Sequence, residues 1–428
     1  MNEKLLQYIW KFRLFNATDL FTTCLKRIVP IYQGIHNTNQ GPDFLNARIK
    51  IGDSTWAGNI ELHVKSSDWV LHRHSEDENY SNVILHVVWV DDKKIDLPFP
   101  TVEIQSHVPK ILLTKYSNWM QTRSFIACEN SIQYAHSLIL TKCKEQMLME
   151  RLQLKSKYIA QLVEQSKGDW DEVCWWVIAR NFGGRVNGDD FENIAKSIPL
   201  KWLQKNRNSI YTIESIIFGQ SGLLSNDFKD AYPKALIKEY KFYKKKYNLI
   251  SPKVSLKFLR MRPLDFPTIK LAQLSAFISQ IDRLFDFVNH TIENGSISNN
   301  VSIILNEYWD HHYCFDDQSI YKNKTPGKST EHNIVINSFV QLIYAFGDCH
   351  QDEEKCNMAI SHLVELKAEN NTIIKSFRKM NIAVDNAFDS QALLQLYNNY
   401  CINKKCLDCS IGYDLIKKDS NLKHHSQS

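Results

Sequence analysis

Residues 44–65 read FLNARIKIGDSTWAGNIELHVK, and this stretch decides the fold of the N-terminal part of the chain. Apolar and polar residues alternate over residues 44–51 and again over 55–65, which is the period of a β-strand. Gly52-Asp53-Ser54 between the two runs is a turn signal. The stretch therefore predicts a β-hairpin with one apolar and one polar face.

The polar face of the second strand holds the residues with catalytic chemistry. Because side chains alternate across a strand, Glu61, His63 and Lys65 share one side. Asp43 enters the first strand, and in a tight hairpin it lies close to their level. Two neighbouring carboxylates bind a hard cation such as Mg²⁺ or Mn²⁺. We therefore expect Asp43 and Glu61 to bind the metal and His63 or Lys65 to assist water or stabilise a phosphate.

The flanking sequence extends this unit. Apolar residues at helical spacing predict a helix within residues 3–15, whereas the Gly-, Pro- and Asn-rich residues 30–43 predict a loop. Residues 82–90 and 101–108 predict further strands. The polar residues 66–81 between them predict a short helix or a loop.

Helical periodicity dominates after residue 110, so the fold class is α+β with a mostly α-helical C-terminal region. The predicted helices cover residues 143–166, 170–181, 229–247, 268–290, 334–346 and 355–380. Gly183-Gly184 predicts a helix C-cap. We expect a β-rich domain over residues 1–125, helical domains over 126–295 and 296–415, and a disordered tail over 416–428.

The hairpin resembles the PD-(D/E)XK nuclease superfamily. That pattern has Pro-Asp at the start of a hairpin and acidic-x-Lys on its second strand. Pro42-Asp43 and Glu61 match it, but His63 stands where the superfamily has Lys, and Lys65 follows two residues later. The resemblance implies a restriction-endonuclease-like core with a central mixed sheet and metal-dependent hydrolysis of phosphodiesters. The alternative is a solvated hairpin face that matches by chance.

More of the chain resembles an uncharacterised bacterial family, a domain of unknown function, over nearly its whole length. This resemblance implies no activity. The stretches that carry it are HNTNQGPDFLNARI (36–49), WAGNIELHVKSSDW (56–69), NVILHVVW (82–89), FGQSGLL (218–224) and FLRMRPLDFPTIKLAQL (258–274).

Histidines are concentrated in the N-terminal part of the chain. They are His36, His63, His72, His74, His86 and His107. With Glu61, Asp68 and Asp77 they offer an alternative zinc or manganese site, and hence a zinc-dependent hydrolase. The simpler interpretation is a core histidine at His86 and a surface loop at His72 and His74.

Three cysteines gather near the C-terminus as Cys401-x4-Cys406-x2-Cys409. A tetrahedral metal site needs a fourth ligand, which Cys128, Cys349, Cys356 or His350 can supply. With Cys128, the set resembles the iron–sulfur staple of some PD-(D/E)XK nucleases, in which one upstream cysteine joins three near the C-terminus, so the site would hold zinc or an iron–sulfur cluster. The alternative is a set of buried thiols between helices.

Basic and aromatic residues interleave between Lys234 and Arg262, where Glu239 is the one acid. Basic groups neutralise phosphates and aromatic rings stack on bases, so this stretch predicts a nucleic-acid surface. The alternative is a lysine-rich helix whose aromatics point inward. The predicted binding residues are Lys244, Lys245, Lys246, Arg260 and Arg262.

The composition is that of a soluble globular protein, with 43% hydrophobic and 23% charged residues and a net charge of +5. We expect no membrane partner, because no run of about 18 apolar residues occurs. The opening MNEKLLQYIWK lacks the pattern of a secretion signal, which favours the cytoplasm. The sequence thus predicts a metal-dependent nuclease-like protein acting on nucleic acid, or a non-catalytic nucleic-acid-binding or scaffold protein on the same fold. It does not predict protein partners.

Overall fold

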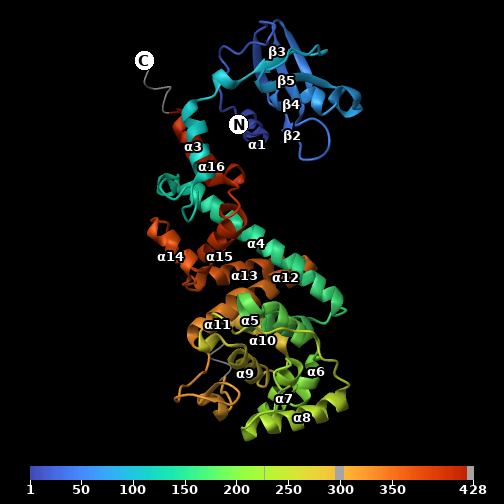
Figure 1. Cartoon of the computed structure of the whole chain (residues 1–428), viewed down its shortest axis with the longest axis vertical. Helices are drawn as coiled ribbons and strands as arrows, with labels where there is room; N and C mark the ends of the chain where they lie inside the picture. Colours follow the sequence, from blue (N-terminus) through green and yellow to red (C-terminus); the bar gives the residue numbers. More distant parts are fainter. Residues whose placement is uncertain (226, 295–302, 422–428) are drawn as a thin grey trace. The chain divides into compact units, whose positions relative to one another are not determined.

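A computed structural model describes residues 1–225, 227–294 and 303–421. The chain divides into two compact units (Figure 1). The first comprises residues 1–144, 376–382 and 396–428, and the second comprises residues 145–375 and 383–395. The domain boundary predicted at residue 295 lies at the start of residues 295–302, which are outside the described residues. Residues 422–428, at the end of the predicted tail, are also outside the described residues.

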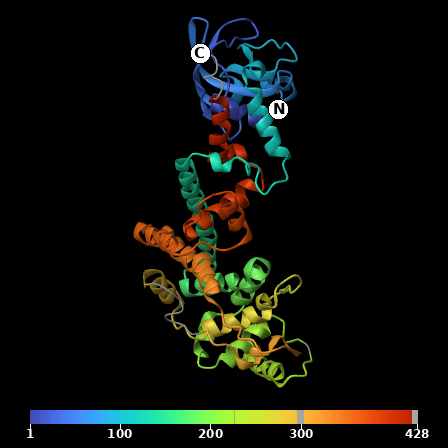
Figure 2. The same ribbon diagram turned by 90° about the vertical axis from the view of Figure 1, so that its left-hand side faces the viewer.

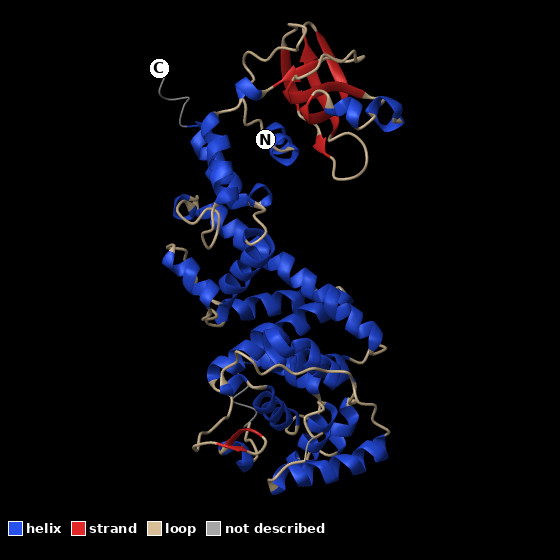
Figure 3. Cartoon of the chain, viewed as in Figure 1, coloured by secondary structure: helices blue, strands red, loops and turns tan. Residues whose placement is uncertain are grey.

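The fold class is α+β, as predicted, with a mixed sheet in the first unit and mostly helices in the rest of the chain (Figure 3). The main strands run in the order β1-β3-β4-β5-β6, and β2 also pairs with β3. The elements of this part are α1 (Glu3–Lys11), β1 (Ile28–Tyr32), β2 (Ile35–His36), β3 (Phe44–Ile51), β4 (Ser54–Lys65), α2 (Asp68–Leu71), β5 (Val83–Val90) and β6 (Thr101–Glu103).

The predicted hairpin is confirmed as the antiparallel pair β3 and β4, in which Ile51 lies opposite Ser54. The next strand, β5, runs parallel to β4, so the chain must cross over between them. That crossover is the polar stretch 66–81, which contains α2 and two short 3₁₀ turns. In the register of the parallel pair, Glu61 lies opposite His86.

Two predictions about the sheet are wrong in part. The loop predicted over residues 30–43 contains β2 and most of β1, and the strand predicted over 101–108 ends at Glu103. The polar face of β4 is also not solvated. Glu61 is 4% exposed and His63 1% exposed, because α1 and α2 both pack against β4. Both faces of this strand are therefore buried at its centre.

The first unit is completed by helices from both ends of the chain. Helix α3 (Lys110–Gln121) contacts α16 (Ser410–Asn421), and the two lie side by side in Figures 1 and 2. Lys115 Nζ of α3 donates a hydrogen bond to Leu415 O at 2.8 Å. Helix α16 also covers the first residues of the tail that was predicted to be disordered.

Where the structure describes it, the second unit is mainly helical, with the short strands β7 (His312–Cys314) and β8 (Asp317–Gln318). The segment predicted as one helix over 268–290 is two helices, as is the segment over 355–380. The helices are α4 (Ser137–Gln165, shared with the first unit), α5 (Trp170–Lys196), α6 (Leu200–Lys205), α7 (Ile210–Gln220), α8 (Ala231–Tyr247), α9 (Pro267–Ile278), α10 (Leu284–Asn294), α11 (Lys328–Ile334), α12 (Val340–His350), α13 (Glu353–Glu365), α14 (Thr372–Lys379) and α15 (Ala387–Gln395).

Candidate metal centre

The two predicted metal-binding carboxylates lie next to each other. The main-chain N–H of Asp43 donates to Glu61 Oε2 at 3.0 Å, and the N–H of Leu62 donates to Asp43 Oδ2 at 3.1 Å. Gln7 of α1 donates through Nε2 to Asp43 Oδ1 at 2.7 Å. The start of β3, the middle of β4 and one helix thus fix both side chains.

Both carboxyl groups are poorly solvated, and this changes their protonation. Burial and the neighbouring charge of Asp43 raise the pKa of Glu61 to about 9. Burial and the charge of Glu3 raise the pKa of Asp43 to about 7. A bound divalent cation would offset the cost of ionising these groups, because an opposite charge favours the carboxylate form.

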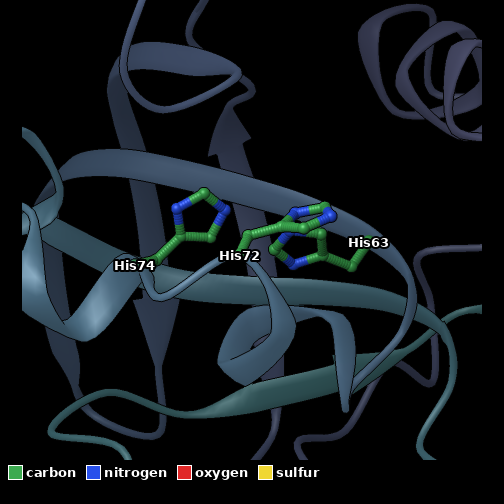
Figure 4. A group of neighbouring side chains, drawn as sticks. All are labelled: His63, His72 and His74. Carbon is green, nitrogen blue, oxygen red and sulfur yellow. The ribbon is translucent and has the colours of Figure 1, made fainter.

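The other oxygen of Glu61 faces histidines. Glu61 Oε1 lies 3.6 Å from His63 Nε2 and 3.5 Å from His74 Nε2. Three histidines, His63, His72 and His74, each place one ring nitrogen within 4.8 Å of the ring nitrogens of the other two (Figure 4). His63 is buried and His72 exposed, so the group reaches solvent on the His72 side.

The buried histidines are neutral. Burial and the charges of His86, His74 and His72 lower the pKa of His63 to about 2, and burial with the charge of His74 lowers that of His86 to about 4. His63 Nδ1 lies 2.9 Å from His86 Nε2. His63 Nε2 lies 3.2 Å from His72 Nδ1, so both ring nitrogens of His63 face another imidazole. A proton on His63 Nδ1 leaves the lone pair of Nε2 to accept from His72 Nδ1 or to bind a metal, and the neutral imidazole is the form in which histidine binds metals.

An unpaired buried atom tests whether these residues fit a metal ion. His74 Nε2 is buried and has no hydrogen-bond partner, although it faces Glu61 Oε1. An orphaned ring nitrogen beside a carboxylate oxygen is a combination that a coordinated cation would satisfy. The donor set of imidazole nitrogens and carboxylate oxygens suits Mn²⁺ or Zn²⁺ better than Mg²⁺, which prefers oxygen.

Trp69 holds the histidines in place. Its side chain is 2% exposed, and its ring contacts those of His63, His74 and His86 with centroid distances of 6.2, 5.2 and 5.3 Å. Its indole N–H donates to Ser75 Oγ at 2.9 Å. The tryptophan that follows Ser66-Ser67-Asp68 is therefore a supporting residue of the site, a role for which the sequence carries no signal.

Other residues considered from the sequence take local roles. Lys65 is exposed at the end of β4, and its main-chain N–H donates to Asp68 Oδ2 at 2.9 Å. Asp77 accepts from the N–H of Asn79 at 2.9 Å. His36 packs against Phe44, with ring centroids 5.3 Å apart. Asp68 and Asp77 do not belong to the group of His63, His72 and His74 found among the described residues.

The four cysteines named from the sequence line one small pocket of the first unit, which Trp119 also lines. All four are free thiols: Cys128, Cys401, Cys406 and Cys409. A hydrogen bond with Cys143 and the N–H groups of Gly412 and Ile411 lower the pKa of Cys409 to about 7, despite its burial. Burial and the other thiols raise the pKa of Cys128 to about 12.

The predicted nucleic-acid residues Lys244, Lys245 and Lys246 lie in the last turn of α8, and Arg260 and Arg262 lie in the segment before α9. All five are exposed. They belong to the second unit, whereas Glu61 and the histidines belong to the first.

The aromatic residues of α8 point in different directions. Tyr247 stacks on Trp202 with ring centroids 4.7 Å apart, and Tyr240 accepts a hydrogen bond from Gln220. Phe242 is 59% exposed. Helix α8 therefore has an exposed basic face, and part of its aromatic content packs inward.

A family model described as a protein of unknown function (DUF2851) matches residues 3–372. No curated protein and no solved structure matches the chain. No helix among the described residues is both long enough and apolar enough to cross a membrane.

Proposed function

We propose that this chain, which belongs to the DUF2851 family of proteins of unknown function, is a metal-dependent nuclease-like protein that hydrolyses phosphodiester bonds in nucleic acid. The observation that carries the proposal is the position of Glu61. One of its oxygens accepts the N–H of Asp43, and the other faces the imidazoles of His63 and His74. A buried carboxylate between a second carboxyl group and neutral histidines suits a divalent cation.

The residues take separate roles in this proposal. Asp43 and Glu61 bind Mg²⁺ or, given the imidazoles, preferably Mn²⁺. A divalent cation held by these residues would lower the pKa of a bound water molecule and would stabilise charge on the phosphate. His63, neutral by virtue of its burial, binds the metal or accepts a proton from water. Lys65, exposed at the end of β4, contacts the phosphate. The resemblance of Pro42-Asp43 and Glu61 to the PD-(D/E)XK pattern and the mixed sheet around them support this reaction class.

A cleavage assay tests the proposal. The metal-depleted full-length protein is mixed with labelled single- and double-stranded DNA and RNA, with Mn²⁺, Mg²⁺ or Zn²⁺ added. We expect Mn²⁺-dependent cleavage. Glu61→Gln and Asp43→Asn should reduce the rate by more than the roughly 10- to 100-fold that loss of an outer metal-site partner costs.

Two exposed acids provide matched controls, Asp53 in the hairpin turn and Glu78 in the crossover. Asp53→Asn and Glu78→Gln should cleave at the wild-type rate. Equal rates for all five proteins would remove Glu61 and Asp43 from the chemistry. Binding of nucleic acid without cleavage of any form would favour the non-catalytic alternative.

A zinc-dependent hydrolase is a second candidate, favoured by the grouping of His63, His72 and His74. Three imidazoles with an open fourth position are a donor set of catalytic zinc sites. The two candidates separate at His72 and Asp43. If His72→Ala loses bound zinc and Asp43→Asn keeps it, the result favours the zinc-dependent hydrolase. If Asp43→Asn loses bound Mn²⁺ and His72→Ala keeps it, the result favours the nuclease. His107→Ala is the control, because His107 lies in a 3₁₀ turn after β6.

The thiol pocket is a second proposed cofactor site, for an iron–sulfur cluster rather than a single zinc ion. Four ligands at about 2.3 Å from one zinc ion must lie within about 4 Å of one another. Among the described residues, however, no three thiols lie within 4.8 Å of one another. A cluster of several irons holds its four thiolates farther apart, and N–H donors to a ligand sulfur, such as those to Cys409, tune such clusters.

A further inference from the structure

A polar cavity of about 440 Å³ lies in the second unit, between helices α4 and α5 and the segment that joins α11 to α12. Its volume is within the range of small-molecule sites, about 300–1,000 Å³. Four cationic side chains line it, which are Arg151, Lys155, Arg180 and Arg185. This cavity shares no residue with the metal centre or with the thiol pocket.

Two irregularities in helices shape the cavity. Gly184 has φ 61° and ψ −158°, a conformation open essentially to glycine alone, and it interrupts α5 between Arg180 and Arg185. A π-helical turn over Val335–Phe339 contributes Asn337 to the lining. Such turns occur frequently at functional sites. The first half of α5 was predicted from the sequence, but its continuation beyond the glycines was not.

The positive charge in the cavity is only partly balanced. Arg180 Nη1 pairs with Asp189 at 2.5 Å and Glu192 at 2.9 Å. Arg151 donates through Nε to Gln391 Oε1 at 2.5 Å. Lys155 Nζ, by contrast, has no hydrogen-bond or ion-pair partner within the part of the chain that the structure describes.

The surroundings of Lys155 disfavour its charge. Burial, together with the charges of Arg151 and Arg180, lowers its pKa to about 8. A half-buried amine held near two guanidinium groups without an acceptor is destabilising unless an anion joins it.

We propose that this cavity binds a small phosphorylated anion, whose phosphate oxygens pair with Lys155 and with the guanidinium groups of Arg151 and Arg185. Arginine presents a planar fork of donors that matches phosphate oxygens, and lysine adds a compact charge. The side chains of Asn181 and Gln341 on the wall supply neutral polar groups for the rest of the ligand. The proposal does not depend on the nuclease-like function.

Titration calorimetry and thermal unfolding of the full-length protein test this site, with pyrophosphate and ATP as the probes. We expect one binding site per chain and a rise in melting temperature with probe concentration. Lys155→Gln should raise the dissociation constant at least tenfold. Lys157→Gln, an exposed lysine on the same helix, should leave it unchanged.

The stability of Lys155→Gln without a probe separates a ligand-binding role from a structural one. Because Lys155 has no partner and lies near like charges, its removal should leave the melting temperature unchanged or raise it. A lower melting temperature would show that the amine supports the fold and would overturn the proposal. So would the absence of binding to wild type by either probe at millimolar concentration, or equal binding by Lys155→Gln.

Discussion

Glu61 illustrates how burial on both faces of a strand alters a single residue. In the metal-free protein its pKa of about 9 lies well above the ordinary value of 4.5. The folded protein therefore holds a proton that the unfolded chain releases, and the free energy of unfolding falls as the pH rises from 4.5 to 9. His63 and His86 have lowered pKa values and act in the opposite direction, but only below about pH 6.5.

Other groups with shifted pKa values, among them Cys409 and Lys155, also titrate between pH 7 and 9, but they are the same in wild type and in Glu61→Gln, so the difference between these two proteins reports on the Glu61 carboxyl group. Without metal, the free energy of unfolding of the wild type should fall between pH 7 and 9, whereas that of Glu61→Gln should not fall for this reason. The difference between the two proteins should therefore grow by about 1–3 kcal/mol over this range, since one pKa unit is worth about 1.4 kcal/mol. Urea denaturation at several pH values measures this. Added Mn²⁺ should cancel the wild-type decline, because the metal binds the ionised form.

Glu78→Gln is the comparison for this measurement, since Glu78 is exposed. Its unfolding free energy should follow that of the wild type at each pH. If Glu61→Gln also follows the wild type, then the carboxyl group is already ionised in the folded protein, and a site that requires a cation there loses its main support.

The sequence predicted the neighbours of Glu61 unevenly. Strand alternation was sufficient to expect His63 on the same face as Glu61. Asp43 is level with Glu61 because the register of β3 and β4 shifts between Phe44 and Ala47, where Asn46 has φ 55°, and the alternation of the sequence does not predict this shift. The approach of His74 depends on Arg73, which adopts the left-handed conformation with φ 56° between His72 and His74. Such a backbone reversal at an arginine has no sequence signal, since residues other than glycine rarely adopt it.

At the scale of elements, regular strands were easier to predict than edge strands. β3, β4 and β5 have strong alternation or β-branched content, and the structure confirms them. β1 lies at the edge of the sheet and contains Pro30, which lacks the N–H that an interior strand needs. Its composition therefore resembles that of the loop beside it, although its pairing with β3 is real.

Helix packing offers a test at the same scale. A Cβ atom on Gly219 of α7 would lie 2.2 Å from the ring of Tyr240 on α8, so the two helices can approach only with glycine there. We expect Gly219→Ala to lower the free energy of unfolding by about 1–3 kcal/mol, the usual cost of overpacking. Urea denaturation followed by circular dichroism measures it.

Gly327 provides the control, because a Cβ atom there would meet nothing within 4 Å. Gly327→Ala should change the unfolding midpoint much less than Gly219→Ala. Equal midpoints for the two variants would mean that α7 and α8 are not held at the spacing described. The packing against α7 would then not fix the position of α8 and of its exposed basic last turn.

At the scale of the whole molecule, the first unit is built from distant parts of the sequence. Residues 1–144 are joined by residues 376–382 and 396–428, while the family match ends at residue 372. The thiol pocket spans this division, since Cys128 comes from the first segment and the other three cysteines come from the last. Spacing along the chain predicted the three C-terminal cysteines, and the resemblance to an iron–sulfur staple added Cys128, but neither predicted the pocket that the four line.

This arrangement gives a metal prediction for the full-length protein. Reconstitution with iron and sulfide under anaerobic conditions should load two or four irons and an equal amount of sulfide per chain, the range expected for four cysteine ligands. Cys401→Ser and Cys406→Ser should lose both, whereas Cys24→Ser, which changes an exposed thiol, should retain them. Circular dichroism checks that the variants remain folded.

Zinc bound at one ion per chain in place of iron would contradict the iron–sulfur assignment. Equal iron in wild type and in both pocket variants would show that the thiols of this pocket are not ligands. Neither outcome bears on the carboxylates and histidines of the metal centre, because the two sites share no residue.

The split of the first unit also sets an order of events during protein synthesis. The ribosome releases Cys128 long before Cys401, and the whole second unit is translated in between, since its last segment ends at residue 395. A nascent chain that extends only to residue 395 therefore contains one of the four cysteines of the thiol pocket. Insertion of a cofactor that needs all four thiols therefore has to follow the synthesis of residue 409, and premature termination shortly before residue 401 leaves Cys128 without the other three thiols.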